Sequence, residues 1–413
     1  MKTLRDRLLI LSLVLLAVRL TISQLPSFEF DESAYRFWTQ RLVENGLSRF
    51  YSNDVFTNNP LGIFYFFWLI GWVKEIIFPQ INYLSSNFDF FLKIPANIAD
   101  ILSGVIIYLL IRKQVTQKWA LLGILAYVLN PAIFFNSSIW GQYDGLSTLF
   151  LLLATYAILI KKMPELSTCF MAVAWIIKPQ AIAFIPVLAL TIFTHSKPFR
   201  YLTSVISFFI ISILLYFPFF PQNPIFGLFY VNTNSASLFN CTTCFAFNFW
   251  QLFGNWKNDL GTFLNIPFIV WGIILYAASL MIILLRKPLF IKFQPPDFYL
   301  TSTISILAFF TFLTRMHERY LFPVFAFLLI AALIKNSVKL KIIYLILSII
   351  HFVNLWYVYY YYNYVYPDPQ FSSFIIYKFL NANYNLFTLF NLIIFAILIL
   401  IYFKSSYTKE SRV

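Results

Sequence analysis

Residues 386–403 read LFTLFNLIIFAILILIYF, a run that contains no charged side chain. At about 1.5 Å of rise per residue, a helix of this length covers most of a hydrocarbon core about 30 Å thick. Lipid offers no partner for backbone N–H and C=O groups, so a run that crosses it must satisfy these groups internally, as a helix does. The stretch therefore predicts a transmembrane helix.

Similar apolar runs recur along the chain. The 413 residues are 60% hydrophobic and 11% charged, whereas a soluble domain carries about 25% charge. The apolar residues do not alternate with a period of two, which argues against a transmembrane β-barrel. We expect an all-α polytopic transmembrane bundle of about 12 spans, in a single membrane-embedded domain over residues 1–413. The expected spans are 8–25, 94–111, 119–137, 146–160, 166–177, 180–194, 201–219, 264–285, 299–314, 320–334, 341–356 and 386–403.

The first of these runs follows Lys2, Arg5 and Arg7. A cleaved signal peptide is the alternative interpretation, but the run is long for one. No small-x-small cleavage site follows it at residues 23–26. We therefore expect an uncleaved first span.

The net charge of +14 fits basic cytoplasmic loops better than a nucleic-acid partner. Residues 60–79 decide the topology, because they are apolar enough to span. If they lie along the outer interface instead, Arg112, Lys113 and Lys118 become cytoplasmic, as the positive-inside rule favours. We expect this interfacial arrangement, within a first external loop over residues 26–93, and cytoplasmic termini. The compact loops favour a prokaryotic plasma membrane.

Residues 166–194 contain a break at Lys178-Pro179 in the middle of an apolar run. Basic residues flank both ends, which predicts that both ends are cytoplasmic. We expect two short helices, 166–177 and 180–194, that meet at an outer-facing tip. One long tilted helix is the alternative.

The three cysteines constrain the protein little. Cys169 lies inside an expected span, and Cys241 and Cys244 form a C-x-x-C in a long loop. No second Cys or His pair accompanies them, which disfavours a zinc site. A local disulfide and two free thiols both remain open.

Charged residues at a membrane are costly and usually functional, and four groups of polar residues fall on the predicted outer side. The first follows the first span and reads FDESAYRFW over residues 30–38. Residues 33–45 have helical spacing and end before Gly46. At the start of this helix Asp31, with Glu32 beside it, could cap the backbone or act as a general base.

Two further groups lie between apolar spans. One of them reads Trp140-Gly141-Gln142-Tyr143-Asp144. Its aromatic residues could lie at the membrane interface, and Asp144 could cap the next helix. Gln142 has no such simple explanation. In Lys178-Pro179-Gln180, the lysine either snorkels to the interface or binds a phosphate.

The fourth group reads Arg315-Met316-His317-Glu318-Arg319-Tyr320. Two arginines on the outer side run against the positive-inside bias. They therefore indicate an anionic ligand such as a phosphate or pyrophosphate. A structural pair between Glu318 and an arginine is the alternative.

A carboxylate loop and two basic sites on one side suit the transfer of a group from a lipid phosphate. The carboxylate would activate an acceptor hydroxyl while cations hold the leaving phosphate. Nucleotide sugars are cytoplasmic, and the chain has no phosphate-binding glycine loop. An outer-facing enzyme would therefore need a lipid-carried donor.

At these residues the sequence resembles the family C (GT-C) membrane glycosyltransferases, in particular small prokaryotic and mannosyltransferase-like members. The matching motifs are Asp31-x-x-x-Tyr35-x-x-Trp38, Gly46 with Phe50-Tyr51, Asn130-Pro131, Trp140-Gly141-Gln142-Tyr143-Asp144-Gly145, Lys178-Pro179-Gln180, the loop 237–254 with Asn248 and Trp250, and Met316-His317-Glu318-Arg319-Tyr320. One element departs from the family. Its D-Y-P-P-G motif reads Asn58-Asn59-Pro60-Leu61-Gly62 here, so the acidic residue is missing.

The resemblance implies an inverting glycosyltransferase. It would move a sugar, a hexose such as mannose, from a polyprenyl-phosphate donor to a hydroxyl of a glycan, lipid or protein acceptor. Asp31 would be the catalytic base. The residues expected to contact donor or acceptor are Glu32, Tyr35, Trp38, Trp140, Gln142, Asp144, Lys178, Gln180, Arg315, His317, Glu318 and Arg319. The resemblance implies no certain cofactor beyond this lipid-linked substrate and leaves a divalent metal open.

Two other functions fit parts of the pattern. A transporter or flippase of a lipid-linked or anionic substrate would have this many spans. However, its polar residues would line the midplane, and few do so here. A ligase or polymerase of lipid-linked glycans would use similar chemistry.

Overall fold

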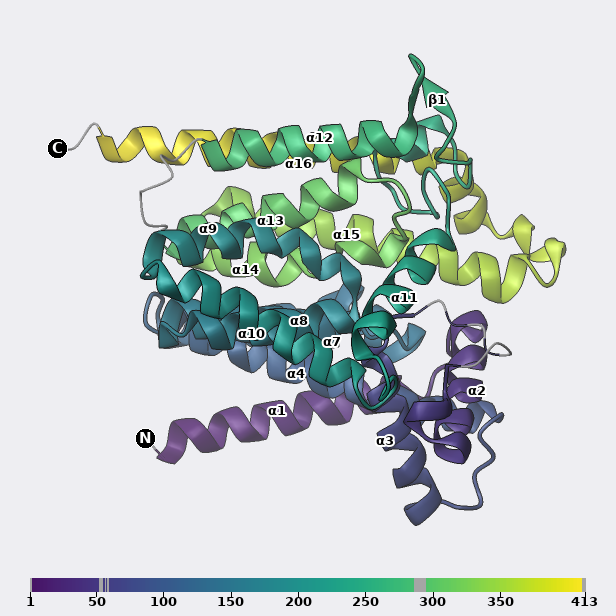
Figure 1. Cartoon of the computed structure of the whole chain (residues 1–413). Coiled ribbons are helices and arrows are strands. Elements are labelled where there is room, and N and C mark those ends of the chain that lie inside the picture. The colour runs from purple at the N-terminus through teal and green to yellow at the C-terminus, as the bar shows by residue number, and fades with distance from the viewer. Residues whose placement is uncertain (1, 52–54, 56, 58, 286–294, 411–413) are drawn as a thin grey trace. The chain divides into compact units, whose positions relative to one another are not determined.

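The computed structural model describes residues 2–51, 55, 57, 59–285 and 295–410 (Figure 1). The expected all-α class is confirmed within these ranges. The described strands are β1 (Thr262–Phe263) and β2 (Ile266–Pro267), which pair as an antiparallel hairpin. Asn58, where the family's acidic residue is missing, lies outside the described residues.

The chain divides into two compact units that alternate along the sequence. The first unit comprises residues 1–110, 127–181 and 199–238. The second unit comprises residues 111–126, 182–198 and 239–413. A single domain over the whole chain stays a prediction.

The first unit packs helices of very different length. Helix α8 contacts both α7 and α10, and α2 packs along α3. Figure 1 shows α2 and α3 lying across the direction of α1 and α4. The interfacial placement of residues 60–79, which contain α3, stays a prediction. The helices are α1 (Lys2–Ile22), α2 (Glu29–Asn45), α3 (Gly62–Ile77), α4 (Asp89–Ile111), α6 (Pro131–Phe134), α7 (Asp144–Tyr156), α8 (Pro164–Ile177), α10 (Phe199–Tyr216) and α11 (Pro224–Ser237).

The second unit is built around α13, which contacts α12, α14 and α16. Helix α15 packs against α14 and α16. The helices are α5 (Gln117–Val128, with its last two residues in the first unit), α9 (Ile185–His195), α12 (Phe268–Leu285), α13 (Pro295–Phe312), α14 (Val324–Ile334), α15 (Val338–Tyr360) and α16 (Ile375–Glu410).

Short 3₁₀ and π segments interrupt or extend many of these helices. The 3₁₀ segments are η1 (Leu47–Arg49), η2 (Ser86–Phe88), η5 (Pro179–Phe184), η6 (Phe249–Phe253), η7 (Glu318–Leu321) and η9 (Pro369–Ser373). The π segments are η3 (Phe135–Trp140), η4 (Ala157–Lys161) and η8 (Tyr361–Val365).

The break at Lys178 is real. Helix α8 ends at Ile177, and Lys178 is extended, with φ −143° and ψ 114°. The following Pro179 disfavours helical backbone at the residue before it. One long helix over residues 166–194 is therefore wrong, and the two expected short helices are present.

The expected number of about 12 spans is not confirmed. Among the described residues, the helices long and apolar enough to cross a membrane are Ser86–Ile111, Asp144–Lys161, Phe199–Tyr216, Val338–Val365 and Ile375–Lys404. A sixth arises if Gln117–Val128 and Pro131–Trp140, bent by 44°, form one span. Other predicted spans are helical but short, such as Pro164–Ile177, Pro179–His195 and Phe268–Leu284.

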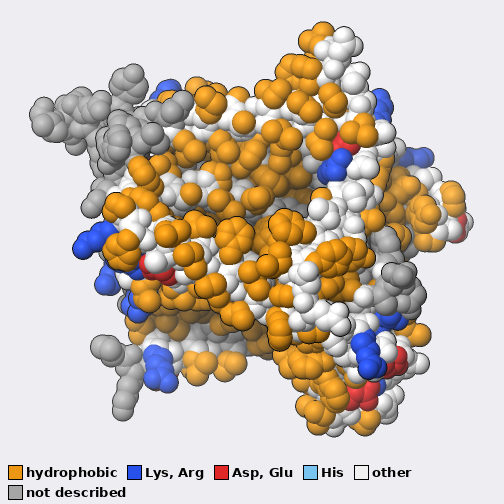
Figure 2. Space-filling view, in the orientation of Figure 1, with side chains coloured by type: hydrophobic (Ala, Val, Ile, Leu, Met, Phe, Trp, Pro, Cys, Tyr) orange, Lys and Arg blue, Asp and Glu red, His pale blue; other side chains and the backbone are white. Residues whose placement is uncertain are grey.

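Helix α10 shows the surface expected of a helix in contact with lipid. Leu202, Val205, Phe209 and Leu214 are all exposed. Figure 2 shows hydrophobic side chains covering this helix. An apolar surface of this kind is stable only where it is not in contact with water.

Two polar features of the fold have structural roles. In the first unit, the buried guanidinium of Arg19 on α1 donates to Asn97 Oδ1 at 2.9 Å and to Asp100 Oδ2 at 2.5 Å on α4. In the second unit, Cys241 and Cys244 form a disulfide, which decides between the two interpretations that the sequence left open.

Candidate functional site

The acidic start of α2 brings two adjacent carboxyl groups to the first unit. The helix cap is Phe28, which makes no side-chain cap hydrogen bond, and Glu29, Asp31 and Glu32 occupy the first turn. Acidic side chains are favourable there because the helix dipole is positive at its N-terminus. Asp31 lies inside the helix, so the interpretation of Asp31 as an N-cap is wrong.

Asp31 is held by two side chains, one at the end of η3 and one just after it. Its Oδ2 accepts a hydrogen bond from Trp140 Nε1 at 3.0 Å and another from Gln142 Nε2 at 2.5 Å. Both bonds go to the same oxygen, and Oδ1 has no hydrogen bond among the described residues. The carboxyl group is half-buried. Asp31 thus has a fixed orientation and one oxygen free to accept a proton.

Gln142 connects this carboxylate to a cation. Its Oε1 accepts from Lys178 Nζ at 3.0 Å, while its Nε2 donates to Asp31. Lys178 Nζ also lies 3.9 Å from Asp144 Oδ2, which accepts from Asn136 Nδ2 at 3.2 Å. We call Asp31, Gln142, Asp144 and Lys178 the polar cluster. Three sequence motifs that are far apart in the chain meet in it.

Local backbone geometry explains how Trp140 and Gln142 both reach α2. Gly141 has φ +96°, a left-handed conformation that favours glycine. A Cβ on this residue would lie 1.7 Å from Glu32 Oε1, so any other residue would require the Glu32 side chain to move. Phe28 reinforces the contact: its ring stacks on Trp140 at 4.3 Å, and its backbone N–H donates to the Trp140 carbonyl oxygen at 3.3 Å.

Glu32 has a very different environment from Asp31. Its side chain is fully buried, and neither carboxyl oxygen has a hydrogen-bond partner among the described residues. Burial raises the pKa of Glu32 well above its usual range, and the charge of Asp89 raises it further. Lys93 and Arg36 oppose the shift without cancelling it. Burial thus favours the protonated form of Glu32 more strongly than that of an exposed glutamate.

Charged groups that the sequence did not single out surround this acidic pair. Arg36 donates to Asp89 Oδ1 at 2.7 Å and to Glu29 Oε2 at 2.6 Å. Lys93 donates to the backbone carbonyl oxygens of Ser23 and Leu25 at 3.1 and 2.8 Å. Asp89 and Lys93 are four residues apart at the start of α4. This spacing is the sequence feature that could have indicated an ion pair near the site, although it is also typical of a pair on a helix surface.

Three other predicted site residues lie outside the polar cluster. Tyr35 and Trp38 are buried in an aromatic core. The ring centroids of Tyr35 and Phe67 are 4.9 Å apart, and those of Trp38 and Phe64 are 5.5 Å apart. These contacts join α2 to α3. Gln180 lies in η5, and its buried Oε1 has no hydrogen-bond partner among the described residues.

The basic motif lies in the second unit, and its charges are paired. Arg315 binds Asp259 through Nε at 2.6 Å and Nη2 at 3.2 Å. Arg319 Nη1 donates to the buried Glu318 at 2.7 Å, as the structural alternative proposed. His317 Nδ1 lies 4.0 Å from the Glu318 carboxylate, and its ring packs on Phe239 at 5.0 Å. Asp259 was not predicted, because it lies far from the motif in sequence.

The structure offers little support for a metal. Among the described residues, no group of three or more His, Cys, Asp or Glu side chains is placed to hold a metal ion.

No protein-family model matches the chain, and no curated protein sequence matches it. Among solved structures, the fold is similar to that of ArnT from Cupriavidus metallidurans, which was crystallised bound to undecaprenyl phosphate. The TM-score is 0.53 at 15% sequence identity, and the alignment covers 96% of this chain and 77% of the ArnT chain. At this identity the likeness concerns the fold. Its apolar helices make this chain an integral membrane protein.

Proposed function

We propose that this protein is an inverting glycosyltransferase that uses a polyprenyl-phosphate sugar as donor and acts on the outer face of the membrane. The observation that carries the proposal is the polar cluster. There a carboxylate with one free oxygen and a buried lysine are joined through a single amide. The motif resemblance to GT-C glycosyltransferases and the fold similarity to a protein crystallised with a polyprenyl phosphate support it.

The chemistry assigned to Asp31 is general-base catalysis. The acceptor hydroxyl oxygen attacks the anomeric carbon, and the bond from that carbon to the phosphate oxygen breaks. The hydroxyl proton passes to Asp31 Oδ1, and the bond electrons leave with the polyprenyl phosphate. One displacement inverts the anomeric carbon, so a second carboxylate is not needed as nucleophile. Glu32, whose neutral form is favoured by burial, fits this requirement.

Lys178 is assigned to the donor phosphate. The leaving phosphate gains negative charge as the glycosidic bond breaks, and a fixed cation stabilises that charge. Lys178 is almost completely buried, and charge interactions are stronger where water is excluded. Arg315 and Arg319 are not assigned this role, because each makes a short ion pair with a carboxylate, at 2.6 and 2.7 Å, whereas Lys178 Nζ lies 3.9 Å from Asp144 Oδ2.

A wholly apolar groove of the first unit suits the lipid part of the donor. It has a volume of about 410 Å³ and is lined by side chains of α3, α4 and α7. Leu146, which lines it, lies two positions after Asp144 on α7. An isoprenoid chain presents only hydrocarbon and would fill such a groove without leaving a polar group unpaired.

The sugar and the acceptor follow from the resemblance alone. A hexose such as mannose is the proposed sugar, and a glycan, lipid or protein hydroxyl is the proposed acceptor. A prokaryotic plasma membrane with both termini cytoplasmic is the proposed setting.

The test is sugar transfer by purified Asp31→Asn, with Glu32→Gln as matched control. Asn keeps the size of Asp31 and can still bind Trp140 and Gln142 through its carbonyl oxygen, but it is no base. We expect transfer from a radiolabelled polyprenyl-phosphate sugar to fall by about 10²–10⁴-fold in Asp31→Asn. Glu32→Gln should stay within about 10-fold of wild type, because burial already favours the neutral form of Glu32.

Near-normal turnover in Asp31→Asn, or a larger loss in Glu32→Gln, would refute the assignment. Product formed by purified protein without an energy source separates a transferase from a transporter. A flippase moves the labelled lipid and forms no new glycosidic bond.

A further inference from the structure

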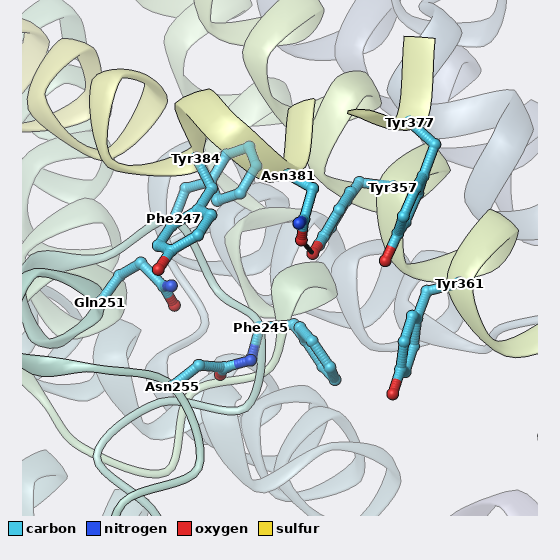
Figure 3. Close-up of a pocket in the computed structure, with 9 residues that line it drawn as sticks. All are labelled: Phe245, Phe247, Gln251, Asn255, Tyr357, Tyr361, Tyr377, Asn381 and Tyr384. Atoms are coloured by element: carbon cyan, nitrogen blue, oxygen red, sulfur yellow. Dashed lines mark hydrogen bonds between the residues drawn. The ribbon is translucent and has the colours of Figure 1, made fainter. Parts of the chain in front are cut away.

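The second unit contains a cavity of about 260 Å³ that the proposed chemistry does not use (Figure 3). Tyr357 and Tyr361 line it at the end of α15 and the start of η8, one helical turn apart. Tyr377, Asn381 and Tyr384 line it along one face of α16. The opposite wall comes from the loop that follows the disulfide and from η6, and its residues are Phe245, Phe247, Gln251 and Asn255.

The lining contains aromatic rings and amides but no charged side chain. A phosphate or carboxylate ligand would lack a cation there. A hydrocarbon chain would bury the amides without a partner, which is costly. The groove in the first unit differs, because its lining is wholly apolar. The chemistry that fits is a neutral ligand with apolar faces and a rim of hydroxyl groups.

The amides of the cavity have hydrogen-bonding atoms to spare. Gln251 is 5% exposed, and its Oε1 has no hydrogen-bond partner among the described residues. Asn255 Oδ1 accepts from the backbone N–H of Phe245 at 2.7 Å, and Asn381 Oδ1 accepts from Tyr357 Oη at 2.8 Å. These two hydrogen bonds, which Figure 3 draws as dashed lines, fix the orientation of both carboxamides. The NH₂ group of each carboxamide is left as a donor. A ligand therefore finds one buried acceptor and two oriented donors.

We propose that this cavity binds one ring of a neutral saccharide. A pyranose has C–H faces that pack on aromatic rings, and hydroxyl groups that both donate and accept. Tyrosine rings and carboxamides meet both requirements. The volume is slightly below the usual range for small-molecule sites, about 300–1,000 Å³, which suits a single ring. Under the proposed function the saccharide is part of the acceptor, and only this last step rests on that proposal.

The experiment measures saccharide binding directly. Full-length protein in lipid nanodiscs, prepared without glycosidic detergents whose headgroups would compete, is mixed with mannobiose, cellobiose or chitobiose. Saturation-transfer NMR reports contact with each sugar. We expect at least one disaccharide to bind the wild type. Gln251→Leu should weaken binding by about 3- to 10-fold, and the double variant with Asn381→Leu should weaken it further.

The matched control is Asn383→Leu, since Asn383 lies on the same helix but does not line the cavity. It should bind like wild type, and Asp31→Asn should also keep full binding. Saccharide binding by a wild-type protein that transfers no sugar would overturn the proposed function and leave this site standing. Lack of binding by all three sugars, or equal binding by wild type and the double variant, would overturn the site.

Discussion

Gln142 orders the charges of the polar cluster because an amide has one donating end and one accepting end. Its NH₂ group faces Asp31 and its oxygen faces Lys178. A carboxylate and an ammonium group in direct contact would neutralise each other. With the amide between them, Asp31 keeps an oxygen that can accept a proton, and the Lys178 ammonium group does not contact Asp31 directly.

Lys178→Met tests the phosphate assignment. Methionine keeps an unbranched apolar stem but removes the charge. We expect kcat/KM for the donor to fall by an amount equivalent to about 1.5–3 kcal/mol, as for a lost hydrogen bond to a charged group. The assay uses limiting donor. Lys197→Met, at an exposed lysine, is the control and should not change the rate. Equal rates for both variants would place the phosphate elsewhere.

Glu32 predicts an unusual pH dependence of stability. Its folded-state pKa is raised by burial and by Asp89, so the folded protein keeps a proton that the unfolded chain loses. Stability therefore falls as pH rises from the ordinary glutamate pKa toward the raised one. Glu32→Gln cannot titrate. It should be more stable relative to wild type at pH 8 than at pH 5.

Thermal unfolding in detergent at the two pH values measures this difference. Glu44→Gln, at an exposed carboxylate on the same helix, is the control and should change little. A wild type and a Glu32→Gln variant with parallel pH profiles would mean that burial does not favour the neutral form of Glu32.

Much of the candidate site could be predicted from sequence, but not its electrostatic surroundings. Asp31, Gln142, Asp144 and Lys178 each lie in a short motif beside an apolar run, where a polar residue is conspicuous. Asp89, Lys93 and Asp259 belong to no such motif. Their importance comes from pairing with Arg36, with carbonyl oxygens after α1 and with Arg315. Pairs between residues so far apart in sequence cannot be predicted from local sequence patterns.

At the scale of elements, the last turn of α13 depends on side chains from another segment. The last carbonyl oxygens of a helix have no intrahelical partner. Trp250 Nε1 donates to the carbonyl oxygen of Phe312 at 2.6 Å, and Asn248 Nδ2 donates to those of Phe310 and Leu313 at 3.2 Å. The loop that resembled a family element thus has a structural function.

Trp250→Phe removes this hydrogen bond and keeps an aromatic ring. We expect the free energy of unfolding to fall by about 1 kcal/mol for the bond, with a further loss from the smaller ring. Thermal unfolding monitored by fluorescence measures this loss of stability. Trp72→Phe, at an exposed position on α3, is the control and should unfold like wild type. Equal midpoints for the two variants would show that α13 does not need this cap.

Helix positions could be predicted better than membrane crossings. Each of the twelve apolar runs lies mostly on helix, because apolarity over many residues is a strong signal. The number of crossings also depends on where helices bend, as between Val128 and Pro131, where the axis turns by 44°. Hydropathy averaged over a window does not detect such a bend.

At the scale of the whole molecule, the topology is set by which loops are basic. The positive-inside rule places Arg112, Lys113 and Lys118 in the cytoplasm only if residues 60–79 do not cross the membrane. The Cys241–Cys244 disulfide adds an independent argument, because disulfides persist outside the reducing cytoplasm. The loop that carries it should therefore lie on the outer side.

Single-cysteine labelling tests this topology. Cys169 is the free thiol, and the disulfide-bonded cysteines do not react with a maleimide, so Cys169→Ser provides the background. Cysteines introduced at Asn232 and Pro369 should react with a membrane-impermeant maleimide in intact cells. Those introduced at Gln117 and Ser196 should react only after the membrane is permeabilised, which also serves as the control for their accessibility. Reaction at Gln117 in intact cells would mean that residues 60–79 cross the membrane. Helix α3 would then be a span, and the loop that presents Asp31 would no longer extend to residue 93.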